Sequence, residues 1–484
     1  MKPAVLVSVL LASLGVASAA AVPLVDHAAD GHHLDARKPP TKRPGQQPAP
    51  AAPVPRPESP AKPAPGKPGK SLGKTCKQIV LLRQQEEEDD SEGSAVARSL
   101  HSKLSKRAFK GSKGPQGPCK VSNFISGTYE SSGKEAKENP NAPMYGWKNL
   151  DVCTDQSWYK GDTSPALKAN VKFMQTEHVL EWQTIEEFFG PYLEKHFAKT
   201  QFTSPDPNDM QGSARAKTNW CGAWSTSWVF PGQNRFALKA GGPEKTPFQW
   251  IADAYPSKEK YRNEFTLLQR GSNSVKGRLF NDDSIFAEAD KKEKKGVKKG
   301  MTSLVKDEPR LAIARLRDVV GARRYLGDAK VRKFMGDVKI RLQTRFDEIE
   351  TALGKPENVR EIAAPRGSTK GPRKVDVWVK RDLGKLWDVF MNNKWVDAKN
   401  KQQKFMEKWI LQIKNKHCTA AMIKALPKDK SKDTPQQSEK REVCEDYTAM
   451  VKGWKDAQKS PFTAPWTALK DPAGDRHTPP TKVV

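Results

Sequence analysis

The stretch MQTEHVLEWQTIEEFF, residues 174–189, is the most strongly patterned apolar segment of the chain. Thr176 is placed to cap the start of a helix, because its hydroxyl can accept an unpaired backbone N–H. Large apolar residues follow at spacings of three and four, which lines one helical face with them: Val179, Trp182, Ile185 and Phe189. The pattern predicts a helix over residues 174–189 with one buried face.

The same stretch contains a candidate acid/base cluster. Glu177, His178 and Glu181 lie within one turn of the predicted helix. Imidazole titrates near neutral pH, and a carboxylate one turn away can orient it, so the three residues could serve a hydrolase or nuclease. The alternative is a histidine that makes a structural hydrogen bond on a half-buried face, and we favour it.

The composition indicates that only part of the chain packs into folded structure and that its partners are negatively charged. Its 484 residues leave room for two or three domains, but only 36% are apolar, and 37 prolines with 33 glycines indicate that part of the chain does not pack. The net charge of +28 favours polyanionic partners such as nucleic acid, anionic lipid or acidic polysaccharide. Charge alone does not choose among these partners.

The first residues are typical of a secretory signal peptide. Lys2 is followed by an apolar run over residues 4–16 and by small residues ending near Ala19, so cleavage is expected there. The run is shorter than the roughly 20 residues that span a bilayer, and no transmembrane segment is expected later in the chain. The sequence therefore predicts an extracellular protein with a signal peptide over residues 1–19.

Residues 20–107 have the composition of a disordered pro-region or linker. Pro, Ala and Lys dominate residues 39–70, which cannot bury enough apolar surface to offset the entropy of ordering. The dibasic pair Lys106-Arg107 is the expected processing site, because it lies in an exposed polar setting.

Secretion predicts that the six cysteines form disulfides, since disulfides persist outside the cell. Six cysteines allow fifteen pairings. Cys418 with Cys444 is the pair we expect. After cleavage, either Cys76 stays attached through a disulfide, for example to Cys119, or one of the five later cysteines remains unpaired. No CxxC spacing occurs, so no metal site is predicted. The candidates are Cys76, Cys119, Cys153, Cys221, Cys418 and Cys444.

The middle of the chain, residues 108–290, is predicted to be a Cys- and Trp-rich α+β region. Residues 121–129 and 224–230 have the β-branched and aromatic character of strands. Six tryptophans are concentrated here and are expected to form core, with a sugar-stacking platform as the alternative: Trp147, Trp158, Trp220, Trp224, Trp228 and Trp250.

The C-terminal part is predicted to be helical, so the whole chain is predominantly α with an α+β middle. Residues 291–306 begin with KKEKKGVKK and are expected to form a Lys-rich loop or hinge. Over residues 307–458 we predict a helical bundle, with one helix starting at Glu308-Pro309 and a boundary at Gly327-Asp328. Further helices are expected around 383–395, 405–413 and 443–454, followed by a loose tail over 459–484.

Several stretches together resemble the C-terminal domain of killer-toxin-like, LysM-bearing family 18 chitinases of fungi, which also occurs in secreted fungal proteins without the catalytic module. They are TEHVLEWQ at 176–183, GSNSVKGRLFN at 271–281, ARLRDVVGARRYL at 314–326, and the helices around Trp387 and 405–409. The resemblance covers roughly residues 123–454 and implies a secreted fungal protein that acts at a cell wall or on another organism. It does not imply chitinase activity, because the DxxDxDxE motif and the LysM repeat are absent.

Three readings of function follow. The first is a noncatalytic, toxin-like or effector-like factor that binds an anionic or glycan surface, on a cell wall, a host or a competitor. The second is a secreted hydrolase or nuclease that uses His178 with Glu177 and Glu181. The third is a structural wall protein anchored by the Pro/Lys arm. The sequence contains no nucleophile-elbow, phosphate-loop, HExxH or dinucleotide motif and predicts no cofactor, so we favour the first reading.

Overall fold

A four-stranded sheet in the order β2-β1-β8-β3 is the largest sheet among the described residues. Strand β1 pairs antiparallel with β2 and parallel with β8, and β8 pairs antiparallel with β3. The computed structural model describes Cys119 and residues 128–150, 152–162, 171–229, 234–293 and 296–467. The strands are β1 (Met144–Trp147), β2 (Trp158–Asp162), β3 (Met174–Glu177) and β8 (Thr266–Gln269).

Short helices surround this sheet in the first half of the described chain. Their capping follows the sequence: Asn219 and Thr246 each accept a backbone N–H at a helix start. The elements are α3 (Ser132–Glu138), α4 (Gln183–Glu187), the π-helix η3 (Phe188–Tyr192), α5 (Leu193–His196), α6 (Trp220–Trp224), the π-helix η4 (Ser225–Val229), α7 (Pro247–Asp253), η5 (Arg262–Glu264) and α8 (Arg270–Phe280).

Three further pairs of very short strands complete the β-structure of the described residues outside the Lys-rich segment. Each pair is antiparallel, and each strand is two residues long. The pairs are β4 (Phe202–Thr203) with β7 (Lys217–Thr218), β5 (Met210–Gln211) with β6 (Ala214–Arg215), and β11 (Glu361–Ile362) with β12 (Arg373–Lys374).

The predicted helix over residues 174–189 is wrong in its first half. Residues 174–177 form β3, whose Met174 and Thr176 lie opposite Gln269 and Leu267 of β8. Thr176 therefore caps no helix, and the helix begins only at Gln183. Pairing with a strand almost a hundred residues away outweighs the local helical period. Val179, Ile185 and Phe189 of the predicted face are nevertheless buried, whereas Trp182 is half-buried and packs against the core.

The predicted strand over residues 224–230 is also wrong. Residues 220–224 form α6, and the chain continues as the π-helix η4. Trp224 and Trp228 are both buried, so the aromatic residues that suggested a strand instead pack on one side of a helix. The other predicted strand, over 121–129, lies almost entirely outside the described residues.

The second half of the described chain is helical, so the protein is α+β with helix predominating. The predicted helix start at Pro309 and the predicted boundary at Gly327-Asp328 are confirmed. Asp328 caps the next helix by accepting backbone N–H groups of Lys330 and Val331. The helices are α9 (Met301–Asp307), α10 (Pro309–Leu326), α11 (Ala329–Leu353), α12 (Leu383–His417), α13 (Ala420–Lys424) and α14 (Pro435–Gln458).

Helix α12 is one helix of 35 residues, where two were predicted. The polar linker between the predicted pair contains neither glycine nor proline, so nothing in it stops a helix. The buried face of α12 includes the small residue Ala398 and the polar residue Gln402 beside apolar ones. The buried stripe continues without interruption at spacings of three and four through Met391, Trp395, Ala398, Gln402, Met406, Trp409 and Ile413.

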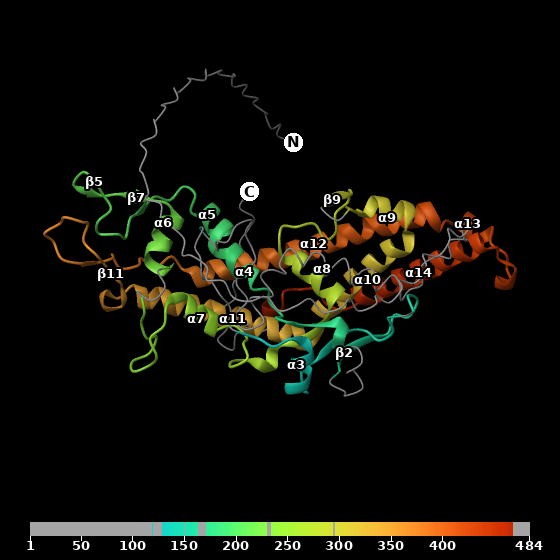
Figure 1. Cartoon of the computed structure of the whole chain (residues 1–484), viewed down its shortest axis with the longest axis horizontal. Coiled ribbons are helices and arrows are strands. Elements are labelled where there is room, and N and C mark those ends of the chain that lie inside the picture. The colour runs from blue at the N-terminus through green and yellow to red at the C-terminus, as the bar shows by residue number, and fades with distance from the viewer. Residues whose placement is uncertain are drawn as a thin grey trace, which may run out of the picture. The chain divides into compact units, whose positions relative to one another are not determined.

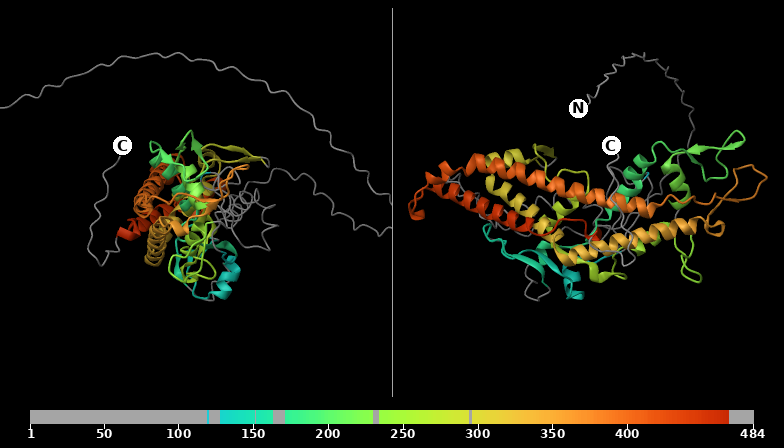
Figure 2. Two further views of the ribbon diagram at one scale, coloured as in Figure 1. Left: turned by 90° about the vertical axis from the view of Figure 1, so that its left-hand side faces the viewer. Right: turned by 180° about the vertical axis from the view of Figure 1, so that it is seen from behind.

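Helix α12 contacts different helices along its two halves. Its first half lies against α11, where Trp387 donates its indole N–H to the carbonyl of Lys339 at 3.1 Å. Its second half lies against α10 and α14, where Gln402 donates to the carbonyl of Val319 at 3.3 Å. Figures 1 and 2 show α12 running beside α11 along one half and beside α14 along the other.

Helices α8 and α10 approach each other closely at glycines. A Cβ on Gly271 would lie 2.4 Å from a carboxylate oxygen of Asp318, and a Cβ on Gly321 would lie 2.1 Å from the hydroxyl of Ser272. Neither position has room for a side chain without a shift of its neighbour. The two helices therefore approach closely at these glycines, and Lys276 of α8 is buried.

The Lys-rich segment is not an irregular hinge, because it contains a hairpin. Strand β9 (Lys291–Glu293) pairs antiparallel with β10 (Gly296–Lys298). Residues on both sides of it contribute to one hydrophobic core. Phe188, for example, stacks on Phe346 with ring centroids 5.4 Å apart.

The tail was expected to be loose from residue 459, but its first residues pack. Phe462 and Trp466 are buried, and Trp466 donates its indole N–H to Asn392 at 2.7 Å. Arg323 holds the carbonyl of Ser460 at 2.7 Å. The signal peptide at 1–19, the pro-region at 20–107 and the end of the tail lie outside the described residues, as do Ala19, Cys76, Lys106 and Arg107.

None of the helices among the described residues combines the length and the apolar character required to cross a bilayer.

Candidate functional site: a buried lysine held by two glutamates

The predicted acid/base residues meet on a lysine that the sequence did not single out. Glu177 ends β3, and Glu181 lies in the loop before α4, whereas Lys276 reaches them from α8. The Lys276 ammonium forms an ion pair with Glu177 and lies 3.2 Å from a carboxylate oxygen of Glu181. It also donates to the backbone carbonyl of His178. Glu177 and Glu181 therefore form a cluster with Lys276 in the structure, rather than with the predicted His178.

Lys276 and Glu177 of this cluster are buried, whereas the Glu181 side chain is 19% exposed. Lys276 has no exposed surface, and the ring of Tyr325 lies 5.9 Å from its ammonium. Burial lowers the pKa of Lys276, but the charges of Glu177 and Glu181 together raise it by more, so its pKa lies above the ordinary value. The lysine stays protonated and cannot act as a base. Lys276 is therefore a buried cation that pairs with two carboxylates at once.

His178 is oriented by a backbone carbonyl and enclosed by aromatic rings. Its Nε2 lies 3.1 Å from the carbonyl oxygen of Pro256, which accepts the hydrogen bond, so Nε2 bears the proton. The rings of Tyr129, Tyr255 and Phe265 lie 4.7–4.8 Å from the imidazole, centroid to centroid. Nε2 is committed to this bond, so only Nδ1 could accept a proton, and His178 is 8% exposed. This geometry favours the structural reading of His178.

Glu186 is a buried carboxyl group close to this cluster in the chain. Burial, with a smaller contribution from the charge of Glu187, raises its pKa to about 7. The folded-state pKa lies above the ordinary value of 4.5, so the folded protein disfavours the ionised form. The resulting stability penalty is absent below pH 4.5, grows as the pH rises, and is complete above pH 7.

We therefore expect Glu186→Gln to stabilise the protein at pH 8 by about 1–3 kcal/mol and to change it little at pH 4. Urea unfolding at the two pH values measures this difference. Glu348→Gln is the matched control, because that side chain is 39% exposed, and it should have a small effect at both pH values. Equal effects of Glu186→Gln at pH 4 and pH 8 would show that ionisation of this group is not the cause.

The disulfide prediction is confirmed for one pair and wrong for another. Cys418 and Cys444 are bonded, as expected, and join the end of α12 to α14. Cys119 is bonded to Cys221 rather than to Cys76. Cys153 is disulfide-bonded as well, and no described cysteine is free. A leader that remained attached after cleavage at Lys106-Arg107 would therefore be held through a cysteine other than Cys119.

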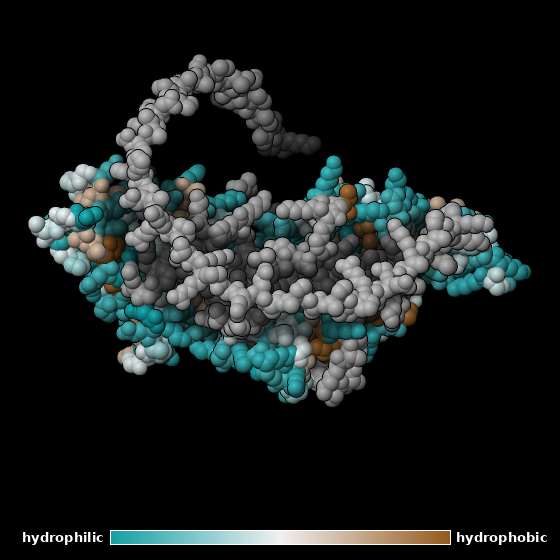
Figure 3. Space-filling model, viewed as in Figure 1, coloured by the Kyte–Doolittle hydropathy of each residue, from teal (hydrophilic) through white to brown (hydrophobic). Residues whose placement is uncertain are grey.

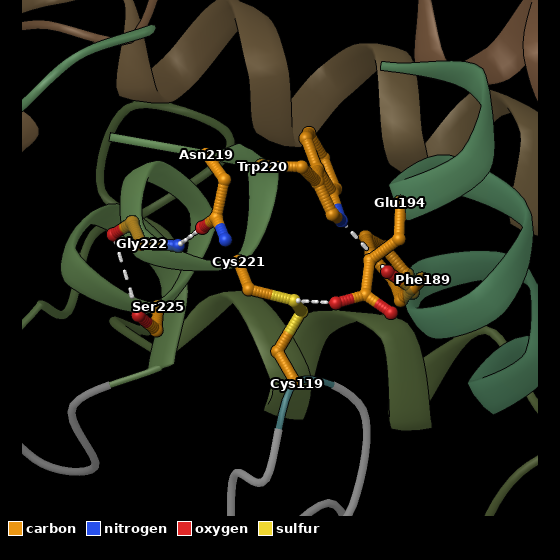
Figure 4. Close-up of a disulfide and its surroundings, with 8 residues drawn as sticks. All are labelled: Cys119, Phe189, Glu194, Asn219, Trp220, Cys221, Gly222 and Ser225. Atoms are coloured by element: carbon orange, nitrogen blue, oxygen red, sulfur yellow. Dashed lines mark hydrogen bonds between the residues drawn. A yellow bond between two sulfur atoms is a disulfide. The ribbon is translucent and has the colours of Figure 1, made fainter. Parts of the chain in front are cut away.

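A carboxylate lies beside the first of these disulfides. Figure 4 shows Glu194 of α5 pointing at the sulfur of Cys221, and their nearest atoms are 2.8 Å apart. The potential ligand atoms of Cys119, Glu194 and Cys221 lie within 4.8 Å of one another. Two sulfurs in a disulfide are not thiolates, however, and thiolate is the form of cysteine that binds metals. In the oxidised protein this group has a covalent structural role.

Five of the six tryptophans predicted to form core in the middle region are buried, whereas Trp158 is half-buried and packs against that core. Trp147, Trp220, Trp224 and Trp228 are almost completely buried, and Trp250 is also buried. The indole of Trp220 donates to the carbonyl of Phe189 at 2.7 Å, next to the disulfide. A sugar ring cannot stack on a face that other side chains already cover. The sugar-platform alternative is therefore not supported by these five residues.

A second candidate surface lies at the C-terminal end of α12. The sequence did not lead us to predict it, because the lysine run KKEKKGVKK was singled out instead. We call residues 404–432 the cationic end. They contain eight lysines but only two acidic residues, Glu407 and Asp429. A count of charge in windows along the chain would have found this segment. It comprises the end of α12, α13 and the short 3-10 helix η7 (Lys430–Lys432).

The lysines of the cationic end are exposed, and five of them have no acidic partner among the described residues. Lys408 and Lys430, by contrast, pair with Glu288 and Glu445. Figure 3 shows that hydrophilic residues cover most of the described surface on this side of the molecule, with brown confined to small patches. The five lysines without an ion pair are Lys404, Lys414, Lys416, Lys424 and Lys428.

The chain matches no protein-family model, no curated protein and no solved structure.

Proposed function

We propose that the protein is a secreted, noncatalytic factor that binds an anionic surface through its cationic end. The observation that carries this proposal is the set of five exposed lysines without ion pairs over residues 404–428. Clustered cations with free charge attract polyanions, and burial or pairing would remove that attraction. The target in this proposal is an anionic glycan or lipid surface on a cell wall, a host or a competitor.

The arginines of α10 differ from these lysines, because the fold uses their charge internally. Arg317 donates to the backbone carbonyls of Asn149 and Asp155, and burial lowers its pKa to about 10. Arg324 donates to the carbonyl of Gln156 at 2.6 Å. Net charge alone therefore overstates the binding surface, whereas the cationic end presents cations that no internal contact uses.

The hydrolase or nuclease alternative has less support. It requires His178 to exchange a proton with a substrate, but His178 donates to a carbonyl within an aromatic enclosure, and Glu177 and Glu181 face Lys276. The proposal retains two expectations from the sequence: export by the signal peptide, and kinship with the secreted fungal proteins that the sequence resembles. We also propose that α10, α11, α12 and α14 form a helical bundle that holds the cationic end rigid.

The test is the salt dependence of binding to immobilised heparin, a polyanion without apolar surface. The full secreted chain should be retained at low salt and elute as ionic strength rises, because screening weakens charge–charge attraction. Lys414→Glu with Lys416→Glu should weaken binding at least tenfold at about 0.1 M salt. Lys355→Glu with Lys370→Glu changes net charge equally at exposed positions elsewhere and should weaken binding less than threefold.

Equal loss of binding in the two double variants would contradict the proposal, because it would mean that net charge rather than the cationic end drives attachment. Hydrolysis of a polymer substrate that disappears in His178→Ala, with folding preserved, would instead support the enzyme reading.

A further inference from the structure

The cationic end also exposes aliphatic side chains among its lysines. Leu411 is 56% exposed, Met422 is 43% exposed and Ile423 is 48% exposed. Helix α13, which contains the last two, has no buried residue at all. Aliphatic groups contribute nothing to the binding of a soluble polyanion, because such a ligand has no apolar layer to receive them. Exposed aliphatic side chains among lysines without ion pairs therefore indicate a partner that has an apolar layer as well as negative charge.

Helix α13 is held in place by bonds rather than by packing. The disulfide between Cys418 and Cys444 fixes the chain just before it, and Thr419 caps its start by accepting the backbone N–H of Met422 at 3.2 Å. After the helix, Arg441 donates to the carbonyl of Pro427 and to the carboxylate of Asp433. This arrangement presents α13 in a defined position without burying its apolar side chains.

We propose that the surface bound by the cationic end is an anionic lipid bilayer, into whose interface Met422, Ile423 and Leu411 insert. This inference rests on the proposed function and specifies its target. Anionic headgroups attract clustered lysines close to the surface, and aliphatic side chains gain by leaving water for the acyl boundary. The cationic end combines both groups on a short, rigidly held segment, which is the combination that interfacial binding requires.

Charge complementarity selects this occupant. Lys414 and Lys416 precede α13, Lys424 ends it, and Lys428 follows, so the two aliphatic residues lie between free cations in the chain. An acidic protein surface has the same sign of charge but would need an apolar patch matched to α13. A bilayer offers its apolar layer everywhere beneath the headgroups, and no shape match is required.

The experiment measures binding of the full chain to vesicles of phosphatidylcholine with 30% phosphatidylserine, to vesicles of phosphatidylcholine alone, and to heparin. We expect the chain to bind the anionic vesicles and heparin but not vesicles of phosphatidylcholine alone, and we expect a loss of about tenfold in vesicle affinity for Met422→Ser with Ile423→Ser. The same double variant should bind heparin as the wild type does, because it retains every lysine. Val379→Ser with Val396→Ser is the control, since those valines are 62% and 55% exposed outside the cationic end, and vesicle affinity should not change.

Unchanged vesicle affinity in Met422→Ser with Ile423→Ser would overturn the inference of insertion, while salt-dependent heparin binding would leave the proposed function in place. Heparin binding without any vesicle binding would also overturn it and would point to a glycan or an acidic protein. If Lys414→Glu with Lys416→Glu bound both the anionic vesicles and heparin as tightly as the wild type, the proposed function itself would be contradicted.

Discussion

Lys276→Met is expected to destabilise the fold by about 3–5 kcal/mol, because it leaves Glu177 and Glu181 without their cation in the interior. The cost comes from two carboxylates that have lost their counter-charge, rather than from the loss of lysine packing. Chemical denaturation at pH 7 measures the change as a shift of the unfolding midpoint at constant slope.

Two further variants separate this cause from a simple packing defect. Adding Glu177→Gln and Glu181→Gln to Lys276→Met removes the two charges that Lys276 had balanced and should recover at least half of the lost stability. Lys333→Met is the matched control, because Lys333 is 65% exposed in an ion pair on the surface of α11, and it should cost less than about 0.5 kcal/mol. A triple variant as unstable as Lys276→Met alone would mean that the charge cluster does not account for the effect.

Glu350→Ala is expected to cost about 3 kcal/mol, because one side chain satisfies three donors in the interior. Glu350 of α11 accepts the indole N–H of Trp378 at 2.8 Å and the backbone N–H groups of Arg381 and Leu383, both at 2.7 Å. It therefore acts as the cap of α12 from a different helix, and its removal leaves buried donors without partners. Thermal or urea unfolding measures the loss.

Glu348→Ala, two residues earlier on α11, provides the comparison. Its side chain is 39% exposed and pairs only with Arg345 among the described residues, so the expected cost is below about 0.5 kcal/mol. Glu350→Gln should be intermediate, since the amide retains one acceptor oxygen. Similar losses for the alanine variants at 348 and 350 would exclude the capping role.

The sequence predicted those features of the fold that depend on neighbours along the chain. Proline at the first position of α10 and aspartate before α11 act within a single turn, so both boundaries could be read directly. The bond between Cys418 and Cys444 was predictable because both cysteines lie in adjacent helical segments. The burial of Val179, Ile185 and Phe189 was also predictable, although the secondary structure of their stretch was only partly so.

The features that failed depend on contacts distant in sequence. Residues 174–177 have a helical period but pair with β8, and no local signal marks that partner. Lys276 seemed one of many surface lysines until the close approach of α8 and α10 at glycines placed it inside. The cap that Glu350 provides to α12 spans more than thirty residues. The cationic end was not predicted either, although a local excess of lysine could have revealed it.

The most direct measurement for the binding account is lysine acetylation of the full chain, free and bound to immobilised heparin, read by mass spectrometry. The account predicts that Lys414, Lys416 and Lys424 are acetylated several-fold more slowly in the bound protein, whereas Lys355 and Lys370 react at the same rate in both states. Equal protection of all five lysines, or protection confined to Lys291 and Lys292 of the hairpin, would contradict it.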